Sequence, residues 1–432
     1  MAVGKFRTII IGGGPVGLAI ANGLDRAGLD FLVVERHHTI ISESGACIML
    51  WPHSTRVFDQ LGIMEACEGR YIPVTDKGTM HLDGTPMRRN DIFKCLADNH
   101  GYQCMNFPRP SLLQTLFEGL PNKSKIRTGV GIEDIETTEM GVRVHLSDGS
   151  IEEGSIVIGA DGVHSKTRGI MRKLANDAGR DLTIGENSPV ASYQIMYGRA
   201  KYIPNADVGT FFETHGTNMS SQMSADKNRI HFGIYRKLPH PTTEMNKEYS
   251  KEEVAEFVEA FSNVKVMPRM TFGEVYKHCT WTRLVNQHEG VIKHWYHGRV
   301  VLAGDSCCVM NPAAGMGVNN GIQSGVVLVN KLHELLSRTS APSTKDFERV
   351  FEEYQNARRD QSQFICDFAA KMIRINTWDS YLAWFMGDVV VPRIMSEEKL
   401  VTKLGTSMVR DMQKFSFLEG GLRSGRVPWS SP

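Results

Sequence analysis

The stretch FRTIIIGGGPVGLAIANGLDRAGLDFLVVE, residues 6–35, decides the fold of this chain. Its first part, FRTIII (6–11), is apolar and β-branched, which is typical of a strand buried on both faces of a parallel sheet. The next part, LAIANGLDRAG (18–28), carries apolar residues at helical spacing, and FLVV (31–34) is a second buried strand that leads to Glu35. The stretch therefore predicts one complete β-α-β unit.

Three glycines lie where the first strand passes into the helix, at the spacing Gly12-x-Gly14-x-x-Gly17. The first permits a tight turn, the second lets the backbone approach a pyrophosphate, and the third lets the helix pack closely on the sheet. Pro15 follows the second glycine, and the free N–H groups at the start of the helix favour phosphates. Glu35 can accept hydrogen bonds from ribose hydroxyls. The unit therefore predicts a dinucleotide site.

Two further motifs follow buried strands. Gly159-Ala160-Asp161-Gly162 comes after SIVIG, and by itself it could be an acidic turn that only caps a helix. Gly304-Asp305 comes after RVVLA, and the glycine-rich segment NPAAGMGV (311–318) follows it. An aspartate at a strand end can bind a cofactor hydroxyl, and glycines can bring backbone amides against a flat ring. By itself this segment could also be an ordinary glycine-rich loop.

Length and composition describe an ordinary globular protein. The chain has 432 residues, of which 41% are hydrophobic and 22% are charged, and this length predicts about two or three domains. The net charge of +1 gives no reason to expect nucleic acid as a partner. We expect no signal peptide and no transmembrane helix. None of the eight cysteines forms a C-x-x-C pair, so we expect no metal site and reduced thiols in a cytoplasmic protein.

The three motifs together, in this order, resemble those of the group A FAD-dependent monooxygenases, the family built on the p-hydroxybenzoate hydroxylase fold. The resemblance runs from Arg7 to about Tyr354 and includes FPRPSLL (107–113). Within the family the chain is similar to the fungal branch typified by the paxilline-pathway epoxidase. The phrases that carry this similarity are RPSLLQTL (109–116), GSIVIGADGVHSKTR (154–168) and RSGRVPW (423–429).

The resemblance implies a set of FAD contacts. Glu35 would hold the adenosine ribose, Arg109 would contact FAD, Asp161 would belong to the motif linked to FAD and nicotinamide, and Asp305 would hold the ribityl chain or pyrophosphate. The loop 312–319 would line the flavin ring. The full expected set is Gly12, Gly14, Pro15, Gly17, Glu35, Arg36, Ala46, Met49, Arg109, Val130, Asp161, Asp305, Pro312, Gly315, Gly317, Val318 and Asn319.

The expected fold class is mixed α/β (α+β): a Rossmann-like FAD-binding domain interleaved with a β-sheet substrate domain, plus C-terminal helices. The nucleotide-binding elements are separated by β-rich segments, so neither domain is continuous in the sequence. The predicted FAD-binding domain comprises residues 1–75, 105–185 and 290–340. The predicted substrate domain comprises residues 76–104 and 186–289, and residues 341–432 form the predicted C-terminal helical region.

The resemblance implies a tightly but non-covalently bound FAD, a transiently bound NAD(P)H, and O2 as co-substrate. The reduced flavin would form a C4a-hydroperoxide, which epoxidises or hydroxylates a substrate. The sequence holds only one dinucleotide fingerprint, which agrees with transient binding of the nicotinamide. Because the cofactor performs the chemistry, we expect few catalytic side chains. We expect a monomer or homodimer.

The sequence also offers candidates for residues that contact the substrate. Arg199, at the end of SYQIMYGR, is the candidate catalytic residue, and a solvated strand-end charge is an equally good interpretation. His231 could donate a proton, although a histidine satisfied within the sheet is the simpler interpretation. The expected pocket walls are Trp51, Phe212, Phe232 and Met316.

Apolar walls of this kind favour a small, bulky hydrophobic metabolite, such as a terpenoid, a meroterpenoid or a prenylated indole. An aromatic hydroxylase of phenols or polyketides is one alternative. A non-catalytic FAD-binding protein is another, because Ser306, Cys307 and Cys308 stand where the family has small residues and then histidine. Ser324 stands where the family often has an acid.

Overall fold

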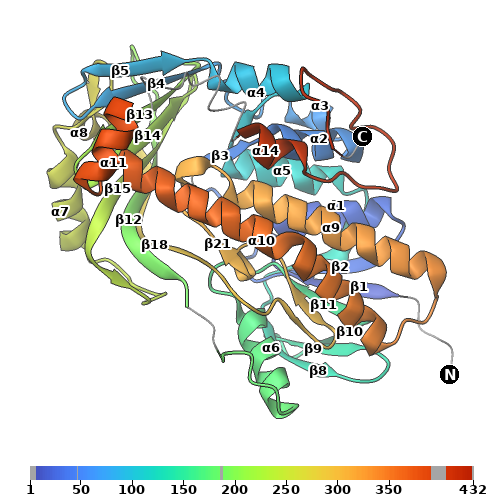
Figure 1. Ribbon diagram of the computed structural model, residues 1–432. Coiled ribbons are helices and arrows are strands. Elements are labelled where there is room, and N and C mark those ends of the chain that lie inside the picture. Colours follow the sequence, from blue (N-terminus) through green and yellow to red (C-terminus); the bar gives the residue numbers. More distant parts are fainter. Residues whose placement is uncertain (1–5, 46, 185–187, 391–404, 431–432) are drawn as a thin grey trace.

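The computed structural model describes residues 6–45, 47–184, 188–390 and 405–430. Two large sheets dominate it, and a long helix runs past both of them (Figure 1). The architecture is the mixed α/β class that the sequence predicts, with a largely parallel sheet that carries helices and a second, largely antiparallel sheet.

The six-stranded sheet has the order β19-β20-β11-β1-β2-β7. All neighbours pair in parallel except β19 and β20. The strands are β1 (Arg7–Ile11), β2 (Asp30–Glu35), β7 (Ile126–Thr128), β11 (Ile156–Gly159), β19 (Tyr296–His297) and β20 (Val300–Leu302). Because β20, β11 and β1 are adjacent and parallel, their carboxyl ends lie together, and the three sequence motifs meet at one edge.

Helices and a small sheet surround these strands. Helix α1 (Pro15–Arg26) contacts both α9 (Gly317–Arg338) and α5 (Arg109–Gly119). A Cβ at Gly325 of α9 would lie 2.7 Å from Ile20, so this glycine lets α1 and α9 approach closely. The other elements here are α2 (Pro52–Leu61), α3 (Met64–Cys67), α4 (Ile92–His100), η1 (Lys123–Lys125), α6 (Lys166–Asp177), the antiparallel sheet of β8 (Ile132–Thr137), β9 (Val142–Leu146) and β10 (Ile151–Gly154), and the pair β3 (Cys47–Leu50) and β6 (Met105–Pro108).

The eight-stranded sheet has the order β21-β18-β12-β15-β14-β13-β4-β5. Its strands are β4 (Asp76–His81), β5 (Pro86–Asn90), β12 (Val190–Lys201), β13 (Thr210–Gly216), β14 (Met219–Ala225), β15 (Arg229–Thr242), β18 (Cys279–Val291) and β21 (Cys308–Val309). β4 pairs in parallel with β13, so residues 76–81 join a sheet whose other strands come mainly from 190–291. The chain therefore interleaves its two sheets, while the exact domain boundaries stay a prediction.

One face of this sheet is closed by its own small core. Phe232 and Phe272 pack edge to face at 5.4 Å between ring centroids, and Phe257 and Phe261 stack at 4.7 Å. The helix that carries the stacked pair begins with a capping box between Ser250 and Glu253. The elements of this cover are α7 (Lys251–Phe261), β16 (Lys265–Met267), β17 (Met270–Thr271) and α8 (Phe272–Tyr276). The opposite face is left for the pocket described below.

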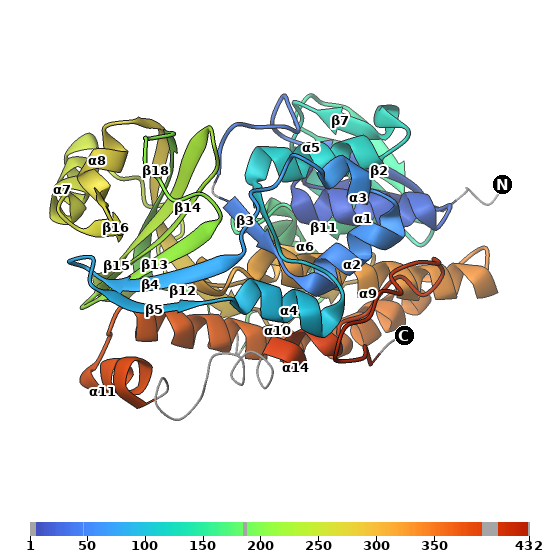
Figure 2. The ribbon, with the colours of Figure 1, turned by 90° about the horizontal axis from the view of Figure 1, so that it is seen from above.

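Helix α10 (Thr344–Asn376) has 33 residues, about 50 Å at 1.5 Å per residue. It contacts α9 beside the six-stranded sheet and β18, β21, β13 and β14 of the eight-stranded sheet (Figures 1 and 2). The short elements α11 (Tyr381–Trp384) and η4 (Phe385–Val390) follow it. In the part of the chain that the structure describes, no helix is both long and apolar enough to cross a membrane.

The described part of residues 341–432 contains the helices α10, α11, η4 and α14 (Thr406–Arg410), and the boundaries of this region stay a prediction. After α14, residues 411–430 have no regular structure. Gly420 and Gly421 both take positive φ angles, and the backbone bonds to other elements: Gly421 accepts from the Arg56 side chain at 2.8 Å. Glycine and proline disfavour a helix here, and contacts to α2 and α4 replace it.

Candidate active site

The first β-α turn builds a cradle from backbone atoms. Gly12 has φ +108°, and a Cβ there would clash with the carbonyl oxygen of Ala160 at the end of β11. A Cβ at Gly17 would clash with the carbonyl oxygen of Gly12. Among the described residues, a Cβ at Gly14 would meet nothing within 4 Å, and no side chain caps α1 at this residue. The turn is thus closely packed at Gly12 and Gly17, and it has free space at Gly14, where the N–H groups of α1 begin.

Acidic and basic side chains flank this turn. Glu35 accepts hydrogen bonds from the N–H groups of Gly13 at 2.7 Å and His37 at 2.8 Å, so its carboxylate is held beside the turn. Arg109, at the start of α5, donates to Ser42 Oγ at 3.0 Å. Burial lowers the pKa of Arg109, and the charge of Glu35 opposes this shift.

The second motif caps a helix. Asp161 accepts from Ser165 Oγ at 2.6 Å, and from the N–H and hydroxyl of Thr167 at 3.0 and 2.9 Å. Arg168 donates to the carbonyls of Ser306 and Val163, each at 2.9 Å. Ser165 is the N-cap of α6 and accepts from the N–H of Arg168 at 2.9 Å, and Asp161 supports this cap, which is the simpler interpretation of its sequence. Its predicted part in cofactor binding stays a prediction.

Asp305 lies in η2 (Gly304–Ser306), at the end of β20. No hydrogen bond or ion pair from the described residues reaches its carboxylate, and burial raises its pKa to about 6. A half-buried carboxylate without a partner among the described residues is costly, and a ligand with hydroxyl groups would satisfy it.

The loop after this aspartate is fixed to the segment around β3. Asn319 Oδ1 accepts from the N–H of Trp51 at 2.9 Å, and its Nδ2 donates to the carbonyls of Met49 and Gly315, each at 2.7 Å. The turn η3 (Pro312–Ala314) ends at Gly315, which has φ +63°. Asn319 therefore links the glycine-rich loop to Trp51, which is one of the predicted pocket walls.

A cavity of about 440 Å³ lies between this loop and the eight-stranded sheet. The loop supplies residues 312–315 to its wall, and the eight-stranded sheet, α4, α10, the pair β3 and β6 with Trp51, η4 and α14 supply the rest. Most of its side chains are apolar; among them are Met49, Trp51, Ile92, Phe93, Phe211 and Met372. A largely apolar cavity beside a polar cradle is the usual arrangement of a substrate next to a cofactor.

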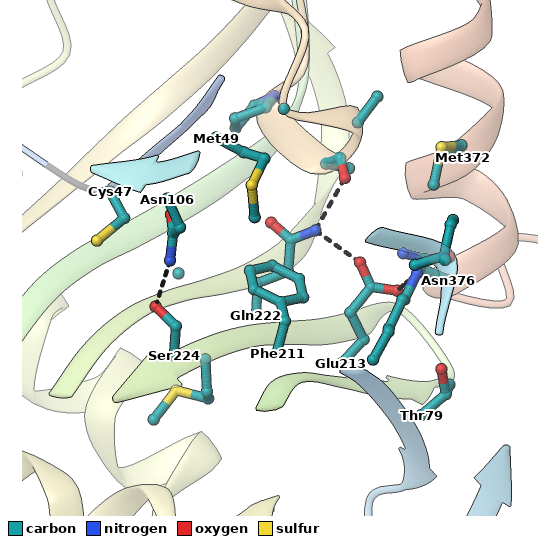
Figure 3. A pocket seen from close by; sticks show the side chains of 18 of the residues that line it. Cys47, Met49, Thr79, Asn106, Phe211, Glu213, Gln222, Ser224, Met372 and Asn376 are labelled. Carbon is teal, nitrogen blue, oxygen red and sulfur yellow. Dashed lines mark hydrogen bonds and ion pairs between the residues drawn. The ribbon is translucent and has the colours of Figure 1, made fainter. Parts of the chain in front are cut away.

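The cavity has two polar ends. At one end Asn106 donates to Ser224 Oγ at 3.0 Å, and at the other Gln222 donates to Glu213 at 2.8 Å (Figure 3). Lys77 forms an ion pair with Glu213 at 2.6 Å. Burial by itself would raise the pKa of Glu213, but Lys77 and His215 hold it well below its usual range. Glu213 is thus ionised although it is only 2% exposed.

Comparison with known proteins identifies the family. Residues 5–369 match the family described as the FAD binding domain. The FAD-dependent monooxygenase srdH of Neurospora crassa is 34% identical over 447 aligned positions, which cover 98% of this chain and 98% of that protein. The chain belongs to the FAD-dependent monooxygenases. It is therefore an oxidoreductase, and its cofactor is FAD.

Two solved structures share the fold of this FAD-dependent monooxygenase. p-Nitrophenol 4-monooxygenase PnpA from Pseudomonas putida has a TM-score of 0.76 at 19% identity, with 94% of this chain and 98% of that chain covered. Klebsiella pneumoniae HpxO, solved with FAD and uric acid, has a TM-score of 0.75 at 20% identity, with 94% and 97% covered. At such identities the similarity concerns the fold alone.

The cradle fits FAD on its own geometry. The opening at Gly14 leaves room for a pyrophosphate at the start of α1, and the Asp305 carboxylate, which has no partner among the described residues, suits a ribityl hydroxyl. The carbonyl of Glu35 accepts from the N–H of Val130 at 3.2 Å, which places Val130 next to Glu35, and its contact with FAD stays a prediction. Arg36 lies near Gly131, 3.7 Å from the position of a Cβ there. Ala46 lies outside the described residues.

The structure corrects two of the expected pocket walls. Trp51 lines the cavity, but Phe211 lines it in place of Phe212. Successive side chains of a strand point to opposite faces, and Phe212 packs into the core on the far face, only 5% exposed. Met316 is fully buried and does not reach the cavity. Phe232 borders the cavity, while its ring packs on Phe272 behind the sheet.

Arg199 does not line the cavity. Its guanidinium forms an ion pair at 2.7 Å with Glu43, which is 68% exposed. The same strand instead presents Tyr197 to the cavity, with its hydroxyl donating to Gln287 at 3.1 Å. The placement of Arg199 gives no support to a catalytic role.

His231 lines the cavity and is 3% exposed. Neither of its ring nitrogens has a hydrogen-bond partner among the described residues, and burial lowers its pKa to about 4. The expectation of a histidine satisfied within the sheet is therefore wrong. A neutral imidazole offers a substrate one donor and one acceptor.

The residues that depart from the family pattern, Ser306, Cys307, Cys308 and Ser324, make contacts within the protein. Ser306 Oγ donates to the carbonyl of Gly159 at 2.6 Å, and so ties β11 to the third motif. Burial raises the pKa of Cys307 and of Cys308 above their usual range, so both thiols stay protonated. Ser324 Oγ donates to the carbonyl of Asn320 at 3.0 Å within α9. None of these groups takes a place in the cradle that FAD needs.

Proposed function

We propose that this protein uses NAD(P)H and O2 to add one oxygen atom to a π-bond of a bulky hydrophobic secondary metabolite, by epoxidation or hydroxylation. The terpenoids, meroterpenoids and prenylated indoles are the substrate classes that we expect. The observation that carries the proposal is the large apolar cavity whose wall includes the loop 312–315, which we expect to line the flavin. Similarity to the paxilline-type branch stays part of this proposal.

The residues of the chain bind, orient and exclude water. Bound FAD, once reduced, supplies the activated oxygen. The N–H groups at Gly14 and the carboxylates of Glu35 and Asp305 would hold FAD. Met49, Trp51 and Phe211 would press an apolar substrate toward the ring and keep water out. His231 would hydrogen-bond one polar group of that substrate.

An aromatic hydroxylase that binds a phenolate is the alternative function. Such an enzyme needs a cation to hold the substrate's charge. The charge of Lys77, which lines the cavity, is already compensated by Glu213 at 2.6 Å. Arg199 is compensated by Glu43 outside the cavity. The guanidinium of Arg88 also lies in the cavity wall, so Arg88→Leu tests this alternative: an enzyme that binds a phenolate would lose substrate affinity, and an enzyme of uncharged substrates would keep it.

The first experiment is an absorption spectrum of the purified protein, recorded before and after anaerobic NADPH and again after admission of air. We expect a bound flavin that bleaches and then recovers. A screen of terpenoid and prenylated-indole metabolites should then find a compound that stimulates NADPH oxidation and gains one atom of ¹⁸O from ¹⁸O2, measured by mass spectrometry. Failure to bind FAD, or NADPH oxidation that never labels a product, would contradict the proposal.

A further inference from the structure

The side chain of Gln222 is held from three directions. It stands on β14 and lines the cavity. Its Nε2 donates to Glu213 Oε1 and to the carbonyl of Ala313, each at 2.8 Å, and its Oε1 accepts from the hydroxyl of Tyr235 at 2.8 Å. A primary amide has two N–H groups, and here both are used. The network therefore leaves one orientation for this amide, in which the nitrogen points to Glu213 (Figure 3).

The ion pair below Gln222 gives that orientation its strength. Glu213 and Lys77 are both largely withdrawn from water, with side chains 2% and 16% exposed. A buried ion pair contributes little net stability, because desolvation offsets the attraction between its charges. Its carboxylate is, however, a strong acceptor for the N–H of Gln222, since hydrogen bonds to ionised groups are about twice as strong as neutral ones.

The far end of the network is the turn that we expect to lie against the flavin. Ala313 belongs to η3, and its carbonyl accepts from Gln222. Asn319 holds the neighbouring Gly315 carbonyl from the side of α9. The turn is thus tied by one amide to the helix and by another to the eight-stranded sheet.

We propose that Gln222 is a positioning residue for the flavin: it fixes the Pro312–Gly315 turn to the floor of the substrate cavity, and the Lys77–Glu213 pair exists to hold its amide. This inference rests on the proposed function, because it takes the turn to line the flavin ring. Under this proposal, the hydrogen bonds of Gln222 set the distance between the flavin and a substrate in the cavity. The adenosine and pyrophosphate half of FAD is held elsewhere, at the first β-α turn, and does not depend on Gln222.

The test separates the two halves of the cofactor in the full-length protein. Gln222→Leu removes the tie to Ala313. We expect it to bind FAD at least about five-fold more weakly, which corresponds to the loss of about one hydrogen bond. The visible absorption band of the bound flavin should also change shape. ADP, which occupies only the adenosine half, should displace FAD with a dissociation constant within about two-fold of the wild-type value.

Further variants distinguish positioning from a general loss of structure. Gln194→Leu is the matched control, because Gln194 lies in the same sheet on β12 and bonds to Arg236 at 2.7 Å, outside the cavity lining. It should leave the flavin spectrum unchanged. Lys77→Met with Glu213→Gln keeps a neutral, weaker acceptor for Gln222, so its effect on the spectrum should be smaller than that of Gln222→Leu. Lys77→Met with Glu213→Leu should reproduce the effect of Gln222→Leu.

Two results would overturn the inference. One is a Gln222→Leu protein with the wild-type flavin spectrum and FAD affinity. The other is an equal loss of ADP and FAD binding, which would mean that the whole fold is disturbed. A wild-type protein that binds FAD but oxygenates nothing would contradict the proposed function alone, because the spectrum and the two affinities do not require turnover.

Discussion

The FAD cradle and the substrate cavity are built in opposite ways. The cradle uses backbone groups and glycines at the ends of adjacent parallel strands, and each of its parts comes from one short motif. The cavity uses side chains from β13, β14 and β15, which are consecutive strands, from β4, which joins β13 from a distant part of the sequence, and from α4 and α10. A site made of backbone shows itself in local sequence, whereas a site made of side chains depends on which face each strand turns inward.

The largest expected effect tests the cradle. Gly14→Val should retain the fold, because a Cβ at Gly14 meets nothing within 4 Å, yet its side chain fills the space that a pyrophosphate needs. We expect FAD affinity to fall by at least about 100-fold, about 2.7 kcal/mol, with an unchanged melting temperature of the apoprotein. Fluorescence titration with FAD measures the first, and circular dichroism the second. Gly169→Ala in α6, which is equally unhindered, is the control. Normal FAD binding by Gly14→Val would show that the cradle lies elsewhere.

The second-largest expected effect tests which face of β13 lines the cavity. Phe212→Ala should destabilise the protein by about 3–5 kcal/mol, because it leaves a hole in the core behind the sheet. Phe211→Ala should cost less stability and instead alter the response to substrates, since Phe211 lines the cavity. Urea unfolding of the two variants, together with metabolite-stimulated NADPH oxidation, makes the comparison. A large loss of stability in Phe211→Ala, together with an altered substrate response in Phe212→Ala, would mean that the other face of β13 lines the cavity.

Asp305 links FAD binding to pH. Its pKa is about 6 in the folded apoprotein and near 3.8 when unfolded, so the native state binds the proton more tightly. The apoprotein therefore loses stability as the pH rises from about 4 to 6, by up to about 3 kcal/mol, and does not regain it above that range. Asp305→Asn removes this penalty: the apo variant should be more stable than wild type at pH 7.5 and equal to it near pH 4, while FAD binds more weakly. Urea unfolding of the apoproteins at both pH values is the measurement, and parallel stabilities would count against it.

The smallest expected effect concerns Arg199. Its partner Glu43 is largely exposed, so the ion pair should contribute less than about 1 kcal/mol to stability. Arg199→Ala should leave kcat/KM for an identified substrate within about two-fold of wild type, because the side chain does not line the cavity. Glu43→Ala and the double variant complete the cycle. A loss of kcat with unchanged stability would restore the catalytic role that the sequence suggested.

The sequence predicted the β-α-β unit and its glycines because each depends on neighbours within about thirty residues. It did not predict Gln222 or Glu213. A glutamine in MSSQMSA and a glutamate in TFFETHG are polar residues in ordinary strands, and nothing local says that both face a cavity. A one-residue shift of a strand exchanges its two faces, which is why Phe212 was expected where Phe211 stands. Polar residues at regular intervals in a buried strand were the one available signal.

From the sequence alone came the fold class, the family resemblance and the dinucleotide cradle, since glycine spacing and buried strands impose their structure locally. Tertiary structure alone decided that Asp305 and His231 lack partners among the described residues, and that Gln222 ties the sheet to the glycine-rich loop. Each of these depends on the register and packing of segments far apart in the chain, and so on contacts that only the folded protein makes.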